Sequence, residues 1–307
     1  MNRREFLKTS VLVLSASAAG CVRDKRFSGI FEPASNPNEA FTFAVISDCH
    51  LGYYKQPEIA RTEFAKTVDL INRLSPDLVV CCGDMITSAP HHKTNEEIEE
   101  MWDEFDRYAS VLKAPLRLAC GNHDINTFAG STESATFDIY TRRYGKTYYS
   151  FDHKKNHFII LNTEAVKKTD EMIPLDGCLD RQQFEWLADD LKKSKNAKNR
   201  FVFLHRPSWQ PVFTSEPAAA FWKDYLHPLF VKNQVDAVFA GHLHFYRDYG
   251  TMDGVKYYGL ANCGGGKVGY GLKNAAKETL EKSGGWRHIM LIQIDNENWK
   301  SQVVLTE

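Results

Sequence analysis

The chain lacks three features that would each indicate a particular class of protein. It has no excess of one charge, because 38 lysines and arginines balance 39 aspartates and glutamates, which argues against a basic nucleic-acid surface. Its N-terminal apolar run, residues 11–19, is shorter than the ~20 residues of a membrane span. Its seven cysteines show neither a paired CxxC zinc pattern nor the density of a disulfide scaffold. With 43% hydrophobic and 25% charged residues, the composition is that of an ordinary globular protein.

The N-terminus resembles a bacterial export signal. Arg3 and Arg4 precede the short apolar run, as in twin-arginine signals, which direct folded proteins across a membrane. Small residues before Cys21 resemble a lipoprotein processing site, which would anchor the protein to a membrane through a lipid. Cleavage after residues 16–18 would instead release a soluble periplasmic protein. We therefore expect an exported protein with three parts: an export signal (1–21), a linker or tether (22–40) and one domain (41–307).

Five apolar runs in the expected domain each stop just before a side chain that can bind a metal ion. They are short and rich in Val, Phe, Leu and Ile, which is typical of strands buried on both faces. The runs cover residues 42–46, 78–82, 116–120, 201–204 and 235–240. The polar residues that follow them are Asp48 and His50, Asp84, Asn122 with His123 and Asp124, His205, and His242 with His244.

The spacing of these runs predicts an α/β fold. Helical patterns occupy residues 57–74 and 95–112, between the first three runs, and the first begins with Pro57 in its first turn. In that helix we expect one buried face formed by Ile59, Phe64, Val68 and Ile71. Asp48 and Asp84 are 36 residues apart and Asp84 and Asn122 are 38, each enough for one strand-helix-strand unit, and the 37 residues from His205 to His242 fit the same unit. Because carboxyl ends of strands in open α/β sheets meet at one crevice, all five motifs should face one another.

The residue types in these motifs predict a site for two metal ions. Carboxylate oxygen, imidazole nitrogen and amide oxygen suit Zn, Mn or Fe, and no thiolate is required. The candidate ligands outnumber what one tetrahedral ion needs: Asp48, His50, Asp84, Asn122, His205, His242 and His244. Two ions about 3.5–4 Å apart can clamp both the attacking and the leaving oxygen of a displacement at phosphorus.

The motifs, taken in order, resemble those of the calcineurin-like metallophosphoesterases over roughly residues 41–260. The resemblance rests on Asp48-x-His50, Gly83-Asp84, Gly121-Asn122-His123-Asp124, His205 and Gly241-His242-x-His244. It implies two facing mixed β-sheets flanked by helices, in four layers, with a dinuclear metal site at the carboxyl ends of the strands. It also implies hydrolysis of phosphoester substrates by a hydroxide that bridges the two ions.

The resemblance implies a role for each motif residue. The first ion would be held by Asp48, His50, Asp84 and His244, and the second by Asp84, Asn122, His205 and His242. His123 would stabilise the phosphoryl charge or protonate the leaving oxygen. Many members carry a carboxylate three residues after the bridging aspartate, but this chain has Thr87 there, and Asp124 could orient His123 instead. A histidine at position 50 argues against the tyrosine-coordinated ferric site of purple acid phosphatases.

Two further features are open to more than one interpretation. Arg206 follows a candidate ligand and could bind a phosphate oxygen bidentately, although a surface salt bridge is equally consistent with its position. The glycines at 264–266 could bring backbone N–H groups near the site, but without a following helix we favour a flexible turn.

Two functions fit the sequence. The first is a metal-dependent phosphoesterase that cleaves either phosphodiesters or phosphomonoesters. The second is a non-catalytic surface lipoprotein that binds a partner and contains a structural metal ion. The enzyme is favoured, because no expected metal ligand is missing.

Overall fold

The computed structural model describes residues 39–88, 94–125, 135–164, 176–210, 215–266, 286–296 and 298–306, and the backbone of residues 11–12, 167–168 and 171–172. Most of the expected export signal and linker, including Cys21, lies outside the described residues. No described helix combines the length and the apolar character that a membrane span requires.

The strands and helices alternate along the first part of the chain, as the sequence predicts. The strands are β1 (Val11–Leu12), β2 (Phe41–Ile46), β3 (Leu78–Cys81), β4 (Leu116–Leu118), β5 (Tyr149–His153), β6 (Asn156–Ile160), β7 (Lys167–Lys168), β8 (Glu171–Met172), β9 (Arg200–Leu204), β10 (Ala237–Ala240), β11 (Arg247–Met252), β12 (Val255–Gly259), β13 (His288–Asp295) and β14 (Asn298–Leu305). The helices are α1 (Pro57–Leu74), α2 (Asn95–Ala109), α3 (Asn122–Ile125), α4 (Ala135–Tyr144), α5 (Arg181–Lys193), α6 (Glu216–Phe221) and α7 (His227–Lys232). A 3-10 turn (η1, Ser194–Asn196) follows α5, and a π-helical turn (η2, Trp222–Leu226) joins α6 to α7.

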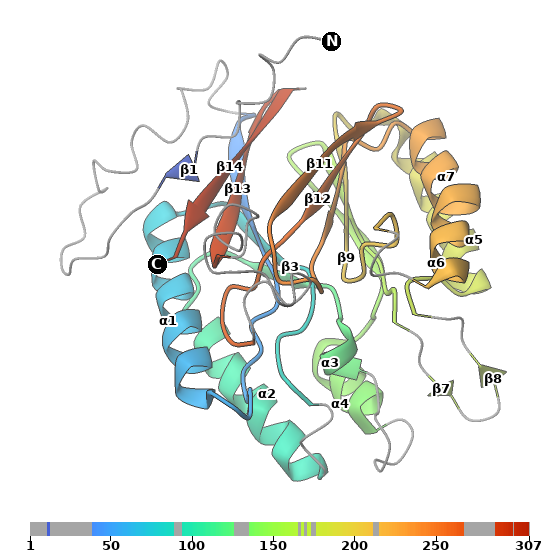
Figure 1. Cartoon of the computed structure of the whole chain (residues 1–307). Helices are drawn as coiled ribbons and strands as arrows, with labels where there is room; N and C mark the ends of the chain where they lie inside the picture. The colour runs from blue at the N-terminus through green and yellow to red at the C-terminus, as the bar shows by residue number, and fades with distance from the viewer. Residues whose placement is uncertain are drawn as a thin grey trace.

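Two mixed sheets face each other in the middle of the molecule, which confirms the predicted fold (Figure 1). The first has the order β1-β14-β13-β2-β3-β4, and the second the order β11-β12-β10-β9-β6-β5. Within them, β2, β3 and β4 run parallel to one another, as do β6, β9, β10 and β12. The carboxyl ends of the motif-bearing strands therefore lie at the same edge of the two sheets.

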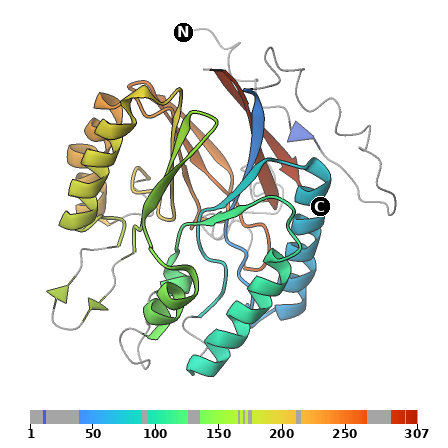
Figure 2. The same cartoon turned by 180° about the vertical axis from the view of Figure 1, so that it is seen from behind.

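Helices cover the outer face of each sheet and complete four layers. Helices α1 and α2 lie on the first sheet, and α5 to α7 lie on the second, as both views show (Figures 1 and 2). Three apolar clusters fill the spaces between layers. The middle one, between the sheets, is built largely from aromatic rings: Phe41, Phe43, Phe158, Phe201, Phe203 and Phe239. Burying apolar area on both faces of each sheet explains the nearly continuous apolar runs in the sequence.

Helix α1 has the predicted boundaries, but one residue of its predicted buried face is exposed. Phe64, Val68 and Ile71 are buried, whereas the side chain of Ile59 is among the exposed large hydrophobics at 41%. Ala60 takes the inward place, because residues 60, 64 and 71 follow the helical period and residue 59 lies about 100° away from that stripe. The prediction for Ile59 is therefore wrong.

Strand β4 is shorter and less buried than the sequence suggested. It ends at Leu118 and forms an edge of its sheet, so Leu116 and Arg117 are only partly buried. Tyr149 of β5, in the other sheet, contacts both the amide nitrogen and the carbonyl oxygen of Leu118 through its hydroxyl, at 3.1 Å each. A side chain thus supplies hydrogen bonds that a further strand would otherwise make.

Candidate metal centre

The loops that follow the parallel strands of the first sheet are held together by backbone hydrogen bonds. Asp48 N–H donates to the carbonyl of Gly83 at 2.9 Å, and His50 N–H donates to that of Asp84 at 3.0 Å. These bonds continue the pairing of β2 and β3 past the ends of the strands. They bring the first two motifs side by side, 36 positions apart in sequence, as the strand-helix-strand spacing predicted.

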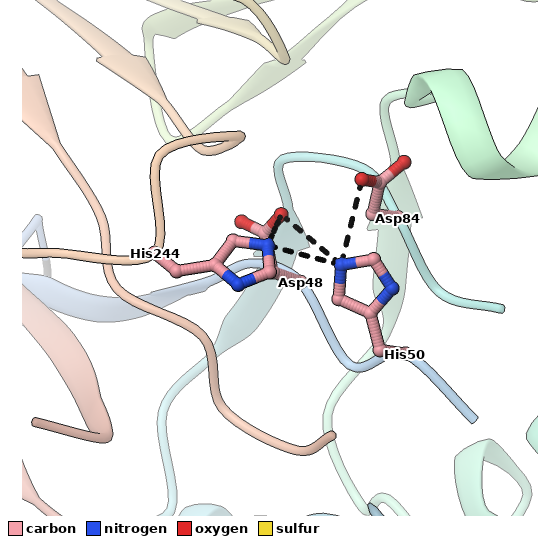
Figure 3. A group of neighbouring side chains, drawn as sticks. All are labelled: Asp48, His50, Asp84 and His244. Carbon is pink, nitrogen blue, oxygen red and sulfur yellow. Dashed lines mark hydrogen bonds and ion pairs between the residues drawn. The ribbon is translucent and has the colours of Figure 1, made fainter. Parts of the chain in front are cut away.

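The first ligand group consists of Asp48, His50, Asp84 and His244 (Figure 3). His50 Nε2 lies 3.5 Å from Asp84 Oδ2 and 3.7 Å from Asp48 Oδ1, while His244 Nε2 lies 3.2 Å from Asp48 Oδ1. All four residues are buried. One ligand atom from each lies within 4.8 Å of the others, close enough to surround one ion.

The second ligand group consists of Asp84, His205 and His242. His205 Nε2 lies 3.1 Å from Asp84 Oδ2 and 3.3 Å from His242 Nδ1. The amide oxygen of Asn122 lies 3.2 Å from the same nitrogen. The structure thus brings all seven predicted ligands together, and Asp84 belongs to both groups.

Hydrogen bonds to backbone groups hold the ligand side chains in place. His205 Nδ1 lies 2.8 Å from the carbonyl oxygen of Cys82, so Nδ1 carries a proton and Nε2 is the nitrogen that faces the cluster, where a metal ion can replace its proton. The backbone N–H of His242 donates to the Asp48 carboxylate at 3.1 Å. This arrangement is the outer support that metal-ligating histidines usually have.

Several ligands have an unfavourable backbone conformation. Asp48, His50, Asp84, His242 and His244 all have φ between 48° and 72°, in the left-handed region that non-glycine residues rarely adopt. Such conformations cost of order 1 kcal/mol or more each and persist only where the surrounding structure enforces them. Their concentration at one cluster indicates a functional site.

The charges of the cluster shift the pKa values of its members. Burial would raise the pKa of Asp48 and of Asp84, but nearby histidines, chiefly His244 and His205, outweigh it and hold both values well below the usual range. Burial would lower the pKa of His205, but Asp84 outweighs it and raises the value to about 10. For His242, burial and the nearby Arg206 lower the pKa.

The donor atoms fit a pair of metal ions. His50 Nε2 faces His244 Nε2 at 3.0 Å, and His205 Nε2 faces His242 Nδ1 at 3.3 Å. Two ring nitrogens this close repel each other unless a proton or a cation lies between them, and the adjacent carboxylates also need a positive partner when buried. Imidazole nitrogen and carboxylate oxygen are suitable ligands for Zn, Mn or Fe.

His123 lies beside the cluster but belongs to neither ligand group. Its ring meets the ring of His50 edge-on with centroids 4.9 Å apart, and its backbone N–H donates to Asp84 Oδ1 at 2.8 Å. Burial lowers the pKa of His123 to about 4, although Asp84 acts in the opposite direction. The ring is therefore neutral at pH 7 and can donate a hydrogen bond.

The Asp124 carboxylate is directed at the backbone of the ligand loops. Oδ2 accepts the N–H groups of Asp84 and Gly121, both at 2.8 Å, and Oδ1 accepts that of Met85 at 2.9 Å. Burial next to Asp84 raises the pKa of Asp124. These bonds fix the loop that carries Asp84, which is a different task from the expected orientation of His123.

Glycines allow the ligand loops to approach one another, a role that the sequence analysis missed. A Cβ atom at Gly121 would lie 2.3 Å from Asp84 Oδ1, and one at Gly266 would lie 2.9 Å from the His244 ring. The triple glycine at 264–266 therefore packs against the cluster, and its interpretation as a flexible turn is wrong. A glycine next to three of the five motifs was the available signal.

Thr87 supports a ligand, which the sequence did not reveal. Its hydroxyl lies 3.0 Å from His50 Nδ1, the ring nitrogen that faces away from Asp48 and Asp84. The hydroxyl oxygen can accept a hydrogen bond from Nδ1–H of His50, which leaves Nε2 available as a ligand. Thr87 thus contacts a ligand histidine from the position where many family members have a carboxylate.

We expect Thr87→Val to weaken metal binding by about 10- to 100-fold, which is typical for the loss of a group that supports a ligand. Valine keeps the shape of threonine but removes the hydroxyl, so the tautomer of His50 is no longer fixed. Isothermal titration of metal into the chelated protein measures the effect. Thr87→Ser keeps the hydroxyl and should bind nearly as well as wild type. Equal affinities for all three proteins would contradict the assignment.

Arg206, which the sequence marked as a candidate for substrate binding, lies at the edge of the cluster. Its Nη1 is 3.2 Å from His242 Nε2, and its guanidinium also forms ion pairs with Glu164 and Asp176. Burial lowers the pKa of Arg206, but these two carboxylates outweigh it and raise the value. Arg206 is therefore a partly buried cation at the site. The sequence offered no signal for Glu164.

The model of one family, described as calcineurin-like phosphoesterase, matches residues 41–246. The chain belongs to the calcineurin-like phosphoesterase family. This match and the ligand cluster support a metal-dependent phosphoester hydrolase, and they confirm the resemblance noted in the sequence.

The individual relatives have low sequence identity to this chain. Purple acid phosphatase 22 of Arabidopsis thaliana is 27% identical over 238 residues, which are 73% of this chain and 48% of that protein. Fe(3+)-Zn(2+) purple acid phosphatase 12 of the same plant is 24% identical, over 76% of this chain and 48% of that protein. The chain thus spans about half the length of these relatives. The solved dimetal phosphatase from Danio rerio has the same fold, with a TM-score of 0.60 at 13% identity, covering 87% of this chain and 99% of that one.

Proposed function

We propose that the protein hydrolyses phosphomonoesters with the help of two divalent metal ions. The observation that carries the proposal is that two buried groups of carboxylate and imidazole ligands share Asp84. Two ions that share a ligand in this way could act on a single phosphoryl group. Both plant relatives described above are phosphatases by name, which favours monoesters over diesters.

In this proposal the chain's residues divide into ligands and groups that contact the substrate. Asp48, His50, Asp84 and His244 would hold one ion, and Asp84, Asn122, His205 and His242 would hold the other. When bound, the ions would polarise the phosphoryl group and lower the pKa of water toward about 7. His123 donates a hydrogen bond to a phosphoryl oxygen or to the leaving oxygen. Asp124 holds the loop of Asp84 through backbone amides.

We propose Mn, Fe or Zn as the metal. The described ligand groups contain only carboxylates and imidazoles, with an amide oxygen next to them, and these donors suit all three metals. One relative is named for an iron–zinc pair. In this chain His50 supplies an imidazole nitrogen to the first ligand group, so we expect Mn or Zn to support activity as well as Fe.

Turnover of nitrophenyl phosphate and of bis-nitrophenyl phosphate tests the proposal. Protein stripped with a chelator should be inactive, and reloading with Mn, Zn or Fe should restore hydrolysis. We expect the monoester to be cleaved with the higher kcat/KM. Preference for the bis-ester would change the substrate class to diesters, and failure of every metal with both substrates would remove the proposed function. The non-catalytic alternative has less support, because the full set of ligands is present.

We also propose that the protein is exported and acts in the periplasm or from a lipid anchor at Cys21. The support is the pair Arg3 and Arg4 and the small residues before Cys21. Fractionation of cells that express Arg3→Lys/Arg4→Lys protein tests export, because the loss of the arginine pair should leave the protein in the cytoplasm. An unchanged distribution would contradict twin-arginine export.

A further inference from the structure

The guanidinium of Arg206 lies between two carboxylates that differ in their exposure to solvent. Nε donates to Glu164 Oε2 at 2.8 Å, and Nη2 lies 3.0 Å from Asp176 Oδ2. The Glu164 side chain is 0% exposed, whereas that of Asp176 is 47% exposed and that of Arg206 is 20% exposed. One partner is thus part of the interior, and the other is at the surface.

Glu164 is suited to act as a fixed anchor. It lies four residues after the end of β6, next to Thr163, whose hydroxyl accepts the backbone N–H of Arg206 at 3.0 Å. The same short segment therefore holds Arg206 by its backbone and by its side chain. A buried carboxylate paired with a guanidinium does not leave it readily, because each charge would lose its partner in a low-dielectric environment.

Asp176 is suited to exchange with another anion. Exposed ion pairs contribute little free energy, because water solvates both partners once they separate. The pair between Nη2 and Asp176 can therefore open at small cost. When this pair opens, one edge of the guanidinium becomes available to another anion. The N–H groups of such an edge can bind two oxygens of a phosphate at once.

This edge of Arg206 is close to the metal ligands. Nη1 lies 3.2 Å from His242 Nε2, and the other ring nitrogen of His242 lies 3.3 Å from His205 Nε2. One imidazole ring therefore separates the guanidinium from the second ligand group. A phosphoryl group bound at the second ligand group would therefore lie within reach of Arg206.

We propose that Glu164, Arg206 and Asp176 form a phosphate-recognition arm, in which Glu164 fixes Arg206 and Asp176 occupies the guanidinium edge until a phosphoryl oxygen replaces it. The proposal rests on the proposed phosphoesterase function and adds to it the group that recognises the phosphate. Glu164 and Asp176 act through Arg206 and are positioning residues. The ligand is a phosphomonoester or free phosphate, because either offers oxygens beyond those that two ions engage.

The two carboxylates should have opposite effects on phosphate binding. Asp176→Asn removes a competing anion, so inorganic phosphate should bind about 3- to 10-fold more tightly. Glu164→Gln removes the anchor, so phosphate should bind about tenfold more weakly, even though a negative charge has been lost. A simple change in electrostatic repulsion would instead make both variants bind more tightly, and a purely structural role would change neither affinity.

The experiment is isothermal titration of inorganic phosphate into the full-length, manganese-loaded protein. Wild type, Asp176→Asn and Glu164→Gln are compared with Asp189→Asn, which removes a remote exposed carboxylate paired with Lys193. The control should bind phosphate as wild type does. Because Glu164→Gln could lower stability, its metal content and melting temperature are measured as well. The combination of Asp176→Asn with Arg206→Ala provides a test that does not depend on Glu164.

We expect the gain from Asp176→Asn to disappear in the Arg206→Ala background, since no guanidinium edge is left to compete for. A gain that persists there would show that Asp176 acts by charge alone and would overturn the proposal. Unchanged affinity in Asp176→Asn would overturn it as well. If the wild-type protein neither binds phosphate nor hydrolyses nitrophenyl phosphate, the proposed function has failed. If it does both and the variants behave alike, only the recognition arm is wrong.

Discussion

Asp84→Asn is expected to abolish binding of both metal ions and to lower phosphoester hydrolysis by on the order of 10³-fold or more. Asp84 belongs to both ligand groups, so its loss affects two ions at once. Metal analysis of protein purified without chelators measures the first effect, and turnover of nitrophenyl phosphate measures the second.

The geometry explains why an amide cannot replace this carboxylate. Asp84 Oδ2 lies 3.1 Å from His205 Nε2 and 3.5 Å from His50 Nε2, while Oδ1 accepts the backbone N–H of His123. Asparagine has one acceptor oxygen and one NH₂ group on its terminal carbon. Its NH₂ group must therefore face either the metal side or the N–H of His123, and both arrangements lose an essential contact.

The matched control is Asp48→Asn. Asp48 is an equally buried carboxylate, but it belongs to the first ligand group alone. We expect this variant to retain metal at the second group and to lose less activity than Asp84→Asn. Equal metal content in wild type and Asp84→Asn would contradict the assignment of Asp84 as the shared ligand.

His123→Ala is expected to lower turnover by about 10²- to 10⁴-fold while leaving the metal content unchanged. The ring lies next to His50 but outside both ligand groups, so its removal takes away a hydrogen-bond donor and no ligand. The measurement is kcat for a nitrophenyl and for an alkyl phosphate, together with metal analysis.

The two substrates separate the two roles of His123. An alkoxide is a poor leaving group, so a hydrogen-bond donor to the leaving oxygen matters more for the alkyl phosphate than for the nitrophenyl phosphate. A donor to a non-bridging oxygen should affect both to a similar degree. Unchanged kcat for both substrates would contradict any catalytic role of His123. Loss of metal would instead make His123 part of the metal centre.

Local sequence patterns gave much of the fold correctly. Helix α1 has the boundaries that were predicted, and the runs before Asp84 and His205 form the expected strands. These features were readable because strands buried on both faces need continuous apolar runs, and because polar residues at their ends need a chemical reason to be there. The gathering of the motifs followed from the parallel order of the strands.

Contacts between segments that lie far apart in the sequence could not be predicted from local patterns. Nothing next to Thr87 in the sequence indicates that its hydroxyl meets His50, and nothing near Glu164 indicates that it holds Arg206. Asp124 was expected to orient His123, yet its carboxylate accepts hydrogen bonds from backbone amides, and such contacts have no sequence signature. The edge position of β4 likewise depends on which strands pair.

By itself, the sequence determined which residues can bind metal and at which strand ends they stand, because ligand chemistry and strand burial are local properties. Only the tertiary structure decided which side chains support those ligands and which carboxylates hold Arg206. Those partners come from other loops and strands, and their hydrogen bonds form only when the two sheets pack face to face.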